Sequence, residues 1–220
     1  SQEWVESIYS EFNGLEDQGV FSHNWTLQDL KDAGIRGKPI PCSIALTHKY
    51  KDGILTRLKT RICIAGHRGN VTKGIHYHEV FSPSPVQPTE RLLQAMMVNL
   101  HLQNLAWDIK MAYCWAEVPD NELFAIKYPK GFERVNEKGE PLYAVVRRNL
   151  YGSPAASRAW SKARDDFILH HFNKNGWQCN RCINDPALFY ITFSGEKGVT
   201  PPQGVNPGDE SVLLVHTDDC

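Results

Sequence analysis

The sequence predicts a fold of the α+β class, in which antiparallel hairpins and amphipathic helices occupy separate stretches of the chain. Two alternating β-prone runs in residues 43–65 flank an Asp-Gly pair, which is a strong hairpin signal. Residues 89–102 repeat apolar side chains at helical spacing. The apolar, β-branched run at residues 211–215 predicts a buried strand, and it leads into two adjacent aspartates.

The composition is that of ordinary globular material. The chain has 220 residues, of which 41% are hydrophobic and 22% charged, enough for one domain or for one domain with a smaller lobe. Its formal net charge of −1 gives it no overall basic footprint, so nucleic-acid binding would need segregated charge. We expect no membrane partner, since no apolar run reaches about 20 residues and the acidic N-terminus is no signal peptide. The six cysteines are interpreted as reduced intracellular thiols.

Residues 1–32 are predicted to be largely helical, because apolar side chains recur there at helical spacing. Glycines and prolines then end the helical pattern and lead into the hairpin at residues 43–65.

Positive charge is concentrated on this hairpin and just after it. Seven basic residues and one acidic residue, Asp52, lie in residues 48–73. Such segregation fits a surface that faces phosphate, although a solvated hairpin face is the alternative. Arg61 is the preferred triphosphate contact, because a guanidinium can bind phosphate through two donors. The basic residues are Lys49, Lys51, Arg57, Lys59, Arg61, Arg68 and Lys73.

A proline-rich connector at residues 74–85 precedes the helix predicted at residues 89–102. For His76, His78 and Glu79 we favour a surface or packing role over a metal site, because no full ligand set accompanies them. Thr89 is the expected N-cap of the helix. Its apolar stripe is expected to lie in the core and consists of Leu92, Leu93, Met96, Met97 and Leu100.

Acidic residues follow apolar runs at two distant places. Asp108 lies in the β-prone run at residues 104–113, which predicts a strand. Asp218 and Asp219 follow the strand at 211–215 and are expected at a tight turn, with Asp218 the better metal ligand; a surface Asp-Asp turn is the alternative. Carboxylates brought together from separate strands would provide the oxygen ligands that Mg²⁺ requires for phosphoryl transfer.

The remaining elements alternate between strands and one long helix. Strands are predicted at residues 123–129 and 143–147, and a helix at 157–175 follows the turn that contains Gly152. A turn and strand are predicted at 183–191, and a mobile loop at 194–209. Cys179 and Cys182 form a C-x-x-C pair, for which zinc is disfavoured because no second pair exists.

In their order along the chain, these motifs resemble the reverse transcriptase of copia-type retrotransposons, from about residue 58 to residue 220. The motifs are Leu58-Lys59-Thr60-Arg61, Gly74-Ile75-His76-Tyr77, Glu79-Val80-Phe81-Ser82-Pro83, Trp107-Asp108-Ile109-Lys110-Met111-Ala112-Tyr113, Tyr128-Pro129-Lys130-Gly131-Phe132, Leu150-Tyr151-Gly152, Arg158-Ala159-Trp160, Asn184-Asp185-Pro186-Ala187-Leu188-Phe189 and Asp218-Asp219.

The resemblance implies a fingers-and-palm polymerase with an antiparallel palm sheet packed on helices, with fingers in residues 1–103 and a palm in residues 104–220. It implies RNA-directed DNA synthesis by two-metal transfer of dNTPs, with Mg²⁺ or Mn²⁺ as the metal and an RNA or DNA template-primer as partner. The implied metal ligands and catalytic residues are Asp108, Asp218 and Asp219, and the implied nucleotide-binding residues are Arg61, Lys59, Tyr113 and Gly152. Tyr113 would screen the 2′ side of the sugar.

The sequence departs from the family pattern at His216-Thr217, where an aromatic-aliphatic pair is usual, and at Ser153-Pro154-Ala155, where polar residues are usual. The chain also stops at Cys220, before a returning palm strand, a thumb, or the ribonuclease H and integrase of a polyprotein. We therefore expect little activity from this chain alone. Its expected setting is intracellular, in a cytoplasmic virus-like particle, and compatible with a nuclear phase. A non-catalytic nucleic-acid-binding remnant and a small metal-dependent hydrolase are the alternatives.

Overall fold

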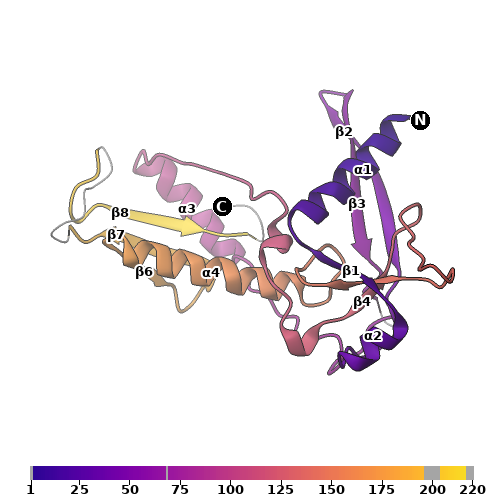
Figure 1. Cartoon of the computed structure of the whole chain (residues 1–220). Helices are drawn as coiled ribbons and strands as arrows, with labels where there is room; N and C mark the ends of the chain where they lie inside the picture. Colours follow the sequence, from indigo (N-terminus) through magenta and orange to yellow (C-terminus); the bar gives the residue numbers. More distant parts are fainter. Residues whose placement is uncertain (1, 68, 196–203, 217–220) are drawn as a thin grey trace. The chain divides into compact units, whose positions relative to one another are not determined.

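The computed structural model (Figure 1) describes residues 2–67, 69–195 and 204–216. These residues form mixed helices and antiparallel sheets, as expected for the α+β class. The chain folds into two compact units, which are described separately: residues 1–81 with 113–160, and residues 82–112 with 161–220. The units do not divide at residue 103, so the expected fingers and palm boundary stays a prediction. Among the described residues, no helix is both long and apolar enough to cross a membrane.

The first unit contains a small antiparallel sheet in the order β1-β5-β4, formed by β1 (Phe21–Trp25), β5 (Tyr143–Val146) and β4 (Ala125–Lys127). The short helix α2 (Leu27–Asp32) begins with a capping box, in which Thr26 and Asp29 satisfy each other's backbone N–H groups. Leu30 of this helix is buried with Ala125 and Val145 of the sheet. Two short 3₁₀ helices, η1 (Ala112–Trp115) and η2 (Asp120–Glu122), precede β4.

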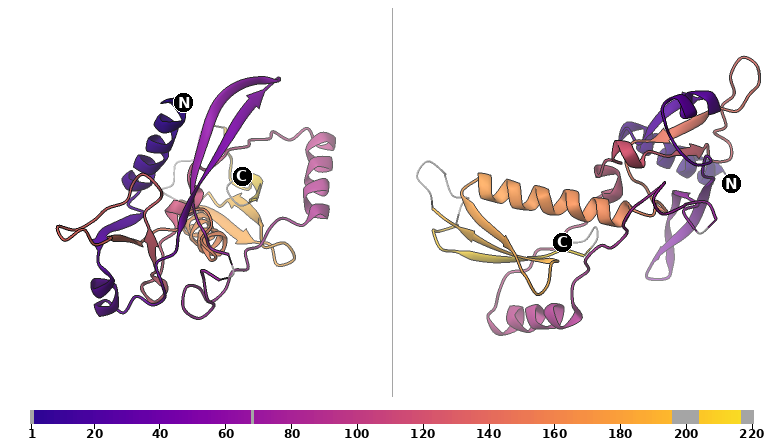
Figure 2. Two further views of the ribbon diagram at one scale, coloured as in Figure 1. Left: turned by 90° about the vertical axis from the view of Figure 1, so that its right-hand side faces the viewer. Right: turned by 90° about the horizontal axis from the view of Figure 1, so that it is seen from below.

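The predicted basic hairpin is confirmed, and Figure 2 shows it as two long paired strands, β2 (Cys42–Lys51) and β3 (Ile54–Ile64). Asp52 and Gly53 form the turn with φ of 52° and 78°, the left-handed conformation that a two-residue hairpin turn requires. Helix α1 (Gln2–Asp17) packs on β3, where the Ser7 hydroxyl lies 2.8 Å from that of Thr60.

Residues 1–32 are less helical than predicted. The helical spacing is confirmed in α1, which buries Phe12 and Leu15. Residues 21–25 instead form β1, which pairs with β5. The reason is tertiary: Gly19 has a φ of +66° and ends the helix, and the next segment gains backbone hydrogen bonds from a strand more than 100 residues away.

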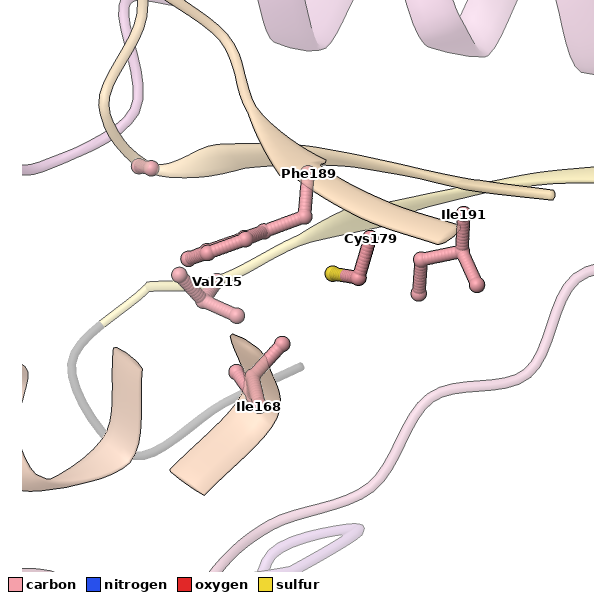
Figure 3. Close-up of a cluster of buried hydrophobic side chains, with 6 residues drawn as sticks. Ile168, Cys179, Phe189, Ile191 and Val215 are labelled. Atoms are coloured by element: carbon pink, nitrogen blue, oxygen red, sulfur yellow. The ribbon is translucent and has the colours of Figure 1, made fainter. Parts of the chain in front are cut away.

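The second unit is built on an antiparallel sheet in the order β6-β7-β8, made of β6 (Trp177–Arg181), β7 (Leu188–Phe193) and β8 (Glu210–Leu214). Helix α4 (Ala156–Lys174), most of which belongs to this unit, packs on the sheet through Ile168. Figure 3 shows Ile168, Cys179, Phe189, Ile191 and Val215 pointing into a common core. Thus Cys179 of the C-x-x-C pair has a packing role in a strand that the sequence analysis did not identify.

Helix α3 (Gln87–Asn99) confirms the predicted helix but not its environment. It begins two residues before Thr89, with Pro88 in its first turn and no side-chain cap from Val86. No residue of α3 is buried, and Leu92 is 60% exposed, so the expectation of a core stripe is wrong. Both views of Figure 2 show α3 apart from the sheet of its unit. The helical period identified an apolar face, but none of its side chains is buried in the part of the chain that the structure describes.

The strand predicted at residues 104–113 does not form. Asp108 occupies an isolated bridge position, while its neighbours have no regular structure before η1. Leu105 is 80% exposed, so this apolar run lacks the buried partner that a strand needs. Met111 adopts a φ of +54°, which interrupts an extended backbone at that point.

Asp185 attaches the start of α3 to the β6-β7 connection. Its carboxylate accepts hydrogen bonds from the backbone N–H groups of Val86, at 2.9 Å, and Ala187, at 3.1 Å, and one from the Thr89 side chain. Burial alone would raise the pKa of Asp185, but the three hydrogen bonds outweigh it and lower the pKa below its ordinary value. The ionised form therefore stabilises the fold.

We predict that Asp185→Asn lowers the free energy of unfolding by about 1–2 kcal/mol at pH 7, because the amide accepts fewer of these hydrogen bonds. A carboxylate with a lowered folded pKa contributes stability above its unfolded pKa of about 3.9, and this contribution is lost as pH falls towards the folded value. The difference between wild type and variant should therefore shrink between about pH 5 and pH 2. Urea unfolding across this range measures it.

The control is Asp166→Asn, which changes an exposed carboxylate on α4. It should leave stability within about 0.5 kcal/mol of wild type throughout. A deficit for Asp185→Asn that stays constant with pH would contradict the role of the ionised carboxylate.

Candidate functional site

One face of the β2-β3 hairpin carries the basic side chains. Strand pairing places Lys49 opposite Arg57, Thr47 opposite Lys59 and Ala45 opposite Arg61. Because strand residues alternate between faces, the three basic residues of β3 share one face. The alternate residues Thr60 and Ile62 are buried, and α1 packs at Thr60 on that side.

The basic face has an electrostatic cost in the absence of an anion. Burial lowers the pKa of Lys59 below its ordinary value, and the positive charges of Arg61, Lys49 and Arg57 lower it further. A bound polyanion would relieve this repulsion. The expected clustering of charge on the hairpin is thus present, and the arrangement is suited to phosphate.

Arg61 lies against the ring of Tyr151, which in turn contacts Tyr113. Its guanidinium carbon lies 4.9 Å from the ring centroid of Tyr151, and the Tyr151 ring meets the Tyr113 ring edge-on, with centroids 5.4 Å apart. Arg61 and Tyr113 were predicted from the sequence as nucleotide-binding residues, and Gly152 directly follows Tyr151. The fold therefore brings three of the four predicted nucleotide-binding residues to one place, and Lys59 precedes Arg61 on the same strand face.

Backbone contacts lock the loop that carries Tyr151 and Gly152 onto the end of β3. The Ile64 N–H donates to the Tyr151 carbonyl at 2.8 Å. Gly152 has a φ of +86°, and a β-carbon there would lie 2.0 Å from the Ile64 carbonyl oxygen. A β-carbon on Gly66 would likewise lie 1.9 Å from the Gly152 carbonyl oxygen. Only glycine allows this approach at either position.

Two residues of the site were not singled out from the sequence. Tyr151 lies inside the Leu150-Tyr151-Gly152 motif, so its position could have been noticed, but nothing in the sequence pairs it with Arg61. Gly66 lies just after the hairpin and belongs to none of the motifs described above. Ser153, in the segment that departs from the family pattern, is buried, and its hydroxyl has no hydrogen-bond partner among the described residues.

The predicted metal ligands are only partly described. Asp108 is exposed, and its carboxylate is the hard oxygen donor that Mg²⁺ prefers. Asp218 and Asp219 lie outside the described residues, and within the described ranges no three His, Cys, Asp or Glu side chains form a metal-binding group. The strand that leads to them is confirmed: Val215, just after β8, is buried and its N–H donates to the Ala187 carbonyl at 2.9 Å. The metal site stays a prediction.

The side chains of His76, His78 and Glu79, for which a surface or packing role was favoured, each contact another residue of the protein. His76 is buried, and its Nδ1 accepts a hydrogen bond from the Thr72 N–H at 2.9 Å. Glu79 forms an ion pair with Arg158 at 2.8 Å, and His78 lies 3.8 Å from Glu122. These three side chains thus have separate protein partners.

Comparison with known proteins identifies two similarities. The model of the family described as reverse transcriptase (RNA-dependent DNA polymerase) matches residues 23–180, which include Arg61, Asp108, Tyr113 and Gly152. The chain is also similar to the retrovirus-related Pol polyprotein from transposon TNT 1-94 of Nicotiana tabacum, with 25% identity over 218 residues. That alignment covers 98% of this chain and 14% of the polyprotein. Both similarities support the resemblance to copia-type reverse transcriptases.

The close contact between β3 and the loop that carries Tyr151 and Gly152 leads to a prediction about stability. Gly152→Ala should lower the free energy of unfolding by about 3 kcal/mol or more, because the added methyl group strikes the Ile64 carbonyl oxygen in addition to straining the backbone. Gly74→Ala is the matched control, since Gly74 has a φ of +84° but nothing within 4 Å of an added β-carbon.

The control should cost about 1 kcal/mol, the strain of the left-handed backbone alone. Urea unfolding of both variants provides the comparison. Equal losses would show that the loop can move away from β3 without cost, and would contradict the close contact.

Proposed function

This chain belongs to the reverse transcriptase family, and from that premise we propose that it supplies the nucleotide-binding and catalytic residues of an RNA-directed DNA polymerase. The observation that carries the proposal is the convergence of Arg61, Tyr113 and Gly152 in the first unit. The motifs selected these residues from positions that are 52 and 39 residues apart in the chain. Chance packing of surface side chains would not be expected to bring all three together.

In the proposed reaction, a primer 3′-hydroxyl attacks the α-phosphorus of a dNTP. A phosphorus–oxygen bond forms to the primer, the bond between the α and β phosphates breaks, and pyrophosphate leaves while the hydroxyl proton is released. Arg61 binds the triphosphate through its planar donors, and Lys59 adds positive charge beside it. The ring of Tyr113 lies against the sugar and leaves no space for a 2′-hydroxyl.

Asp108, Asp218 and Asp219 are the proposed Mg²⁺ or Mn²⁺ ligands. The bound metal would stabilise the charge that develops on the attacking and leaving oxygens. The proposed contribution of this chain is to supply carboxylates from the segment before η1 and from the sequence that follows β8, and to bind the triphosphate through the hairpin. In this assignment the hairpin belongs to the fingers, and the β6-β7-β8 sheet with α4 belongs to the palm.

The chain spans 14% of the length of the polyprotein that it resembles. We therefore propose that it works as part of a longer Pol polyprotein, with template-primer as its macromolecular substrate and with ribonuclease H and integrase regions alongside it. The proposed setting is a cytoplasmic virus-like particle. Sequence reading comes from base pairing with the template, so the protein needs only backbone contacts to the duplex.

A nucleic-acid-binding remnant without turnover is the second candidate. The Ser153-Pro154-Ala155 segment favours it. The family usually has polar residues at this place near the nucleotide, whereas here the hydroxyl of Ser153 is buried. The two candidates share the basic hairpin face and differ at the metal site. Metal binding is therefore the property that separates them.

We expect the 220-residue chain to bind Mn²⁺, and Asp108→Ala to weaken that binding by about ten-fold or more, because one of three carboxylate ligands is lost. Mn²⁺ titration followed by electron paramagnetic resonance measures the affinity. Asp120→Ala, which removes an exposed carboxylate from η2, should leave the affinity unchanged.

Primer extension on a homopolymer RNA template, with dNTPs and Mg²⁺, tests turnover in the same samples. We expect little extension from this chain alone. Robust extension that Asp108→Ala abolishes would confirm the polymerase and refute the expected inactivity. Mn²⁺ binding that is insensitive to Asp108→Ala would refute the proposed metal site and favour the remnant.

A further inference from the structure

Tyr151 lies between the two side chains that the proposed function places at the nucleotide. Its ring faces the guanidinium of Arg61, whose central carbon is 4.9 Å from the ring centroid, and meets the Tyr113 ring at an interplanar angle of 75°. The Tyr151 carbonyl accepts a hydrogen bond from the N–H of Ile64, which lies three residues after Arg61 on β3. The ring and the base of the Arg61 side chain are therefore attached to one rigid piece of backbone.

The kind of partner that Arg61 has is informative. Within the described residues no carboxylate lies within ion-pair distance of Arg61, and its buried Nε has no hydrogen-bond partner. A carboxylate would orient the guanidinium but would also compete with phosphate for its donors. An aromatic face attracts the cation without occupying the N–H groups at its edge. Arg61 is thus held against the ring without forming an ion pair among the described residues.

Pre-ordering of a long side chain favours ligand binding. A free arginine side chain loses rotamer freedom each time it binds a phosphate, and this loss weakens the affinity. A side chain already held against a fixed ring has lost that freedom before the ligand arrives. The edge-on contact with Tyr113 fixes the ring itself, because aromatic pairs favour this geometry.

We propose that Tyr151 is a positioning residue, which holds the Arg61 guanidinium ready for the triphosphate of the incoming nucleotide. The inference rests on the proposed function, because it takes the triphosphate as the ligand of Arg61. It adds a residue and a role that the family motif does not assign: an aromatic platform that orients the cation and itself makes no phosphate contact.

The test compares wild type, Tyr151→Leu and Tyr151→Phe by nuclear magnetic resonance of the full chain. The Nε–Hε signal of Arg61 is identified by its loss in Arg61→Lys. Inorganic tripolyphosphate is titrated, and the same signal reports both the ring above Arg61 and the affinity for the anion. Tyr151→Met replaces the leucine variant if the latter does not fold.

In wild type we expect a ring-current shift of the Arg61 signal and saturable binding of tripolyphosphate. Tyr151→Leu should lose the shift and bind about five-fold more weakly, and Tyr151→Phe should recover most of both. Tyr128→Leu is the matched control, because it removes a ring that lies 5.0 Å from a different arginine, Arg134, in the same unit. It should leave the affinity within about two-fold of wild type.

Equal affinities for wild type and Tyr151→Leu would overturn the positioning role while leaving the nucleotide site intact. An equal loss in Tyr128→Leu would also overturn it, because general destabilisation would then explain the effect. Absence of any Arg61-dependent binding in wild type would overturn the proposed nucleotide site itself, and the inference with it.

Discussion

The backbone contact between the end of β3 and the Tyr151-Gly152 loop is the constraint on which the candidate site depends. Two segments nearly 90 residues apart approach so closely that neither Gly66 nor Gly152 could carry a β-carbon without a clash. The hydrogen bond from Ile64 to Tyr151 fixes their relative position. Since Arg61 lies on the same strand, backbone geometry brings its guanidinium to the Tyr151 ring, whose face attracts the cation.

The two faces of the hairpin have different roles, one in packing and the other in carrying positive charge. One face buries Thr60 and Ile62, and α1 packs there, so it contributes to stability. The other face concentrates positive charge in a chain whose net charge is −1. Because strand side chains alternate, one pair of strands can be attached to the fold through one face and leave the other free for a polyanion. Burial, and after it the repulsion from neighbouring positive charges, lowers the pKa of Lys59, and this is the cost of the arrangement.

The second unit is stabilised by a core beneath α4 and by the buried carboxylate of Asp185. Val215 belongs to that core, which fixes the chain just before the segment expected to carry the paired aspartates (Figure 3). Helix α3 is attached at its start through Asp185, and among the described residues none of its side chains is buried. Stability in this unit is thus concentrated at the sheet and α4, where most of its apolar side chains are buried.

By itself, the sequence determined the local elements and the family. The Asp-Gly turn, the helices α3 and α4 and the strand β8 follow from period and turn chemistry, and motif order identified Arg61, Tyr113 and Gly152. Tertiary structure alone decided that residues 21–25 pair as β1, that the Asp108 segment forms no strand, that the α3 stripe is exposed, and that the Tyr151 ring lies against the Arg61 guanidinium. The physical reason is that periodicity shows which face of an element is apolar or charged, whereas burial and ring contacts require a partner that lies far away in the chain.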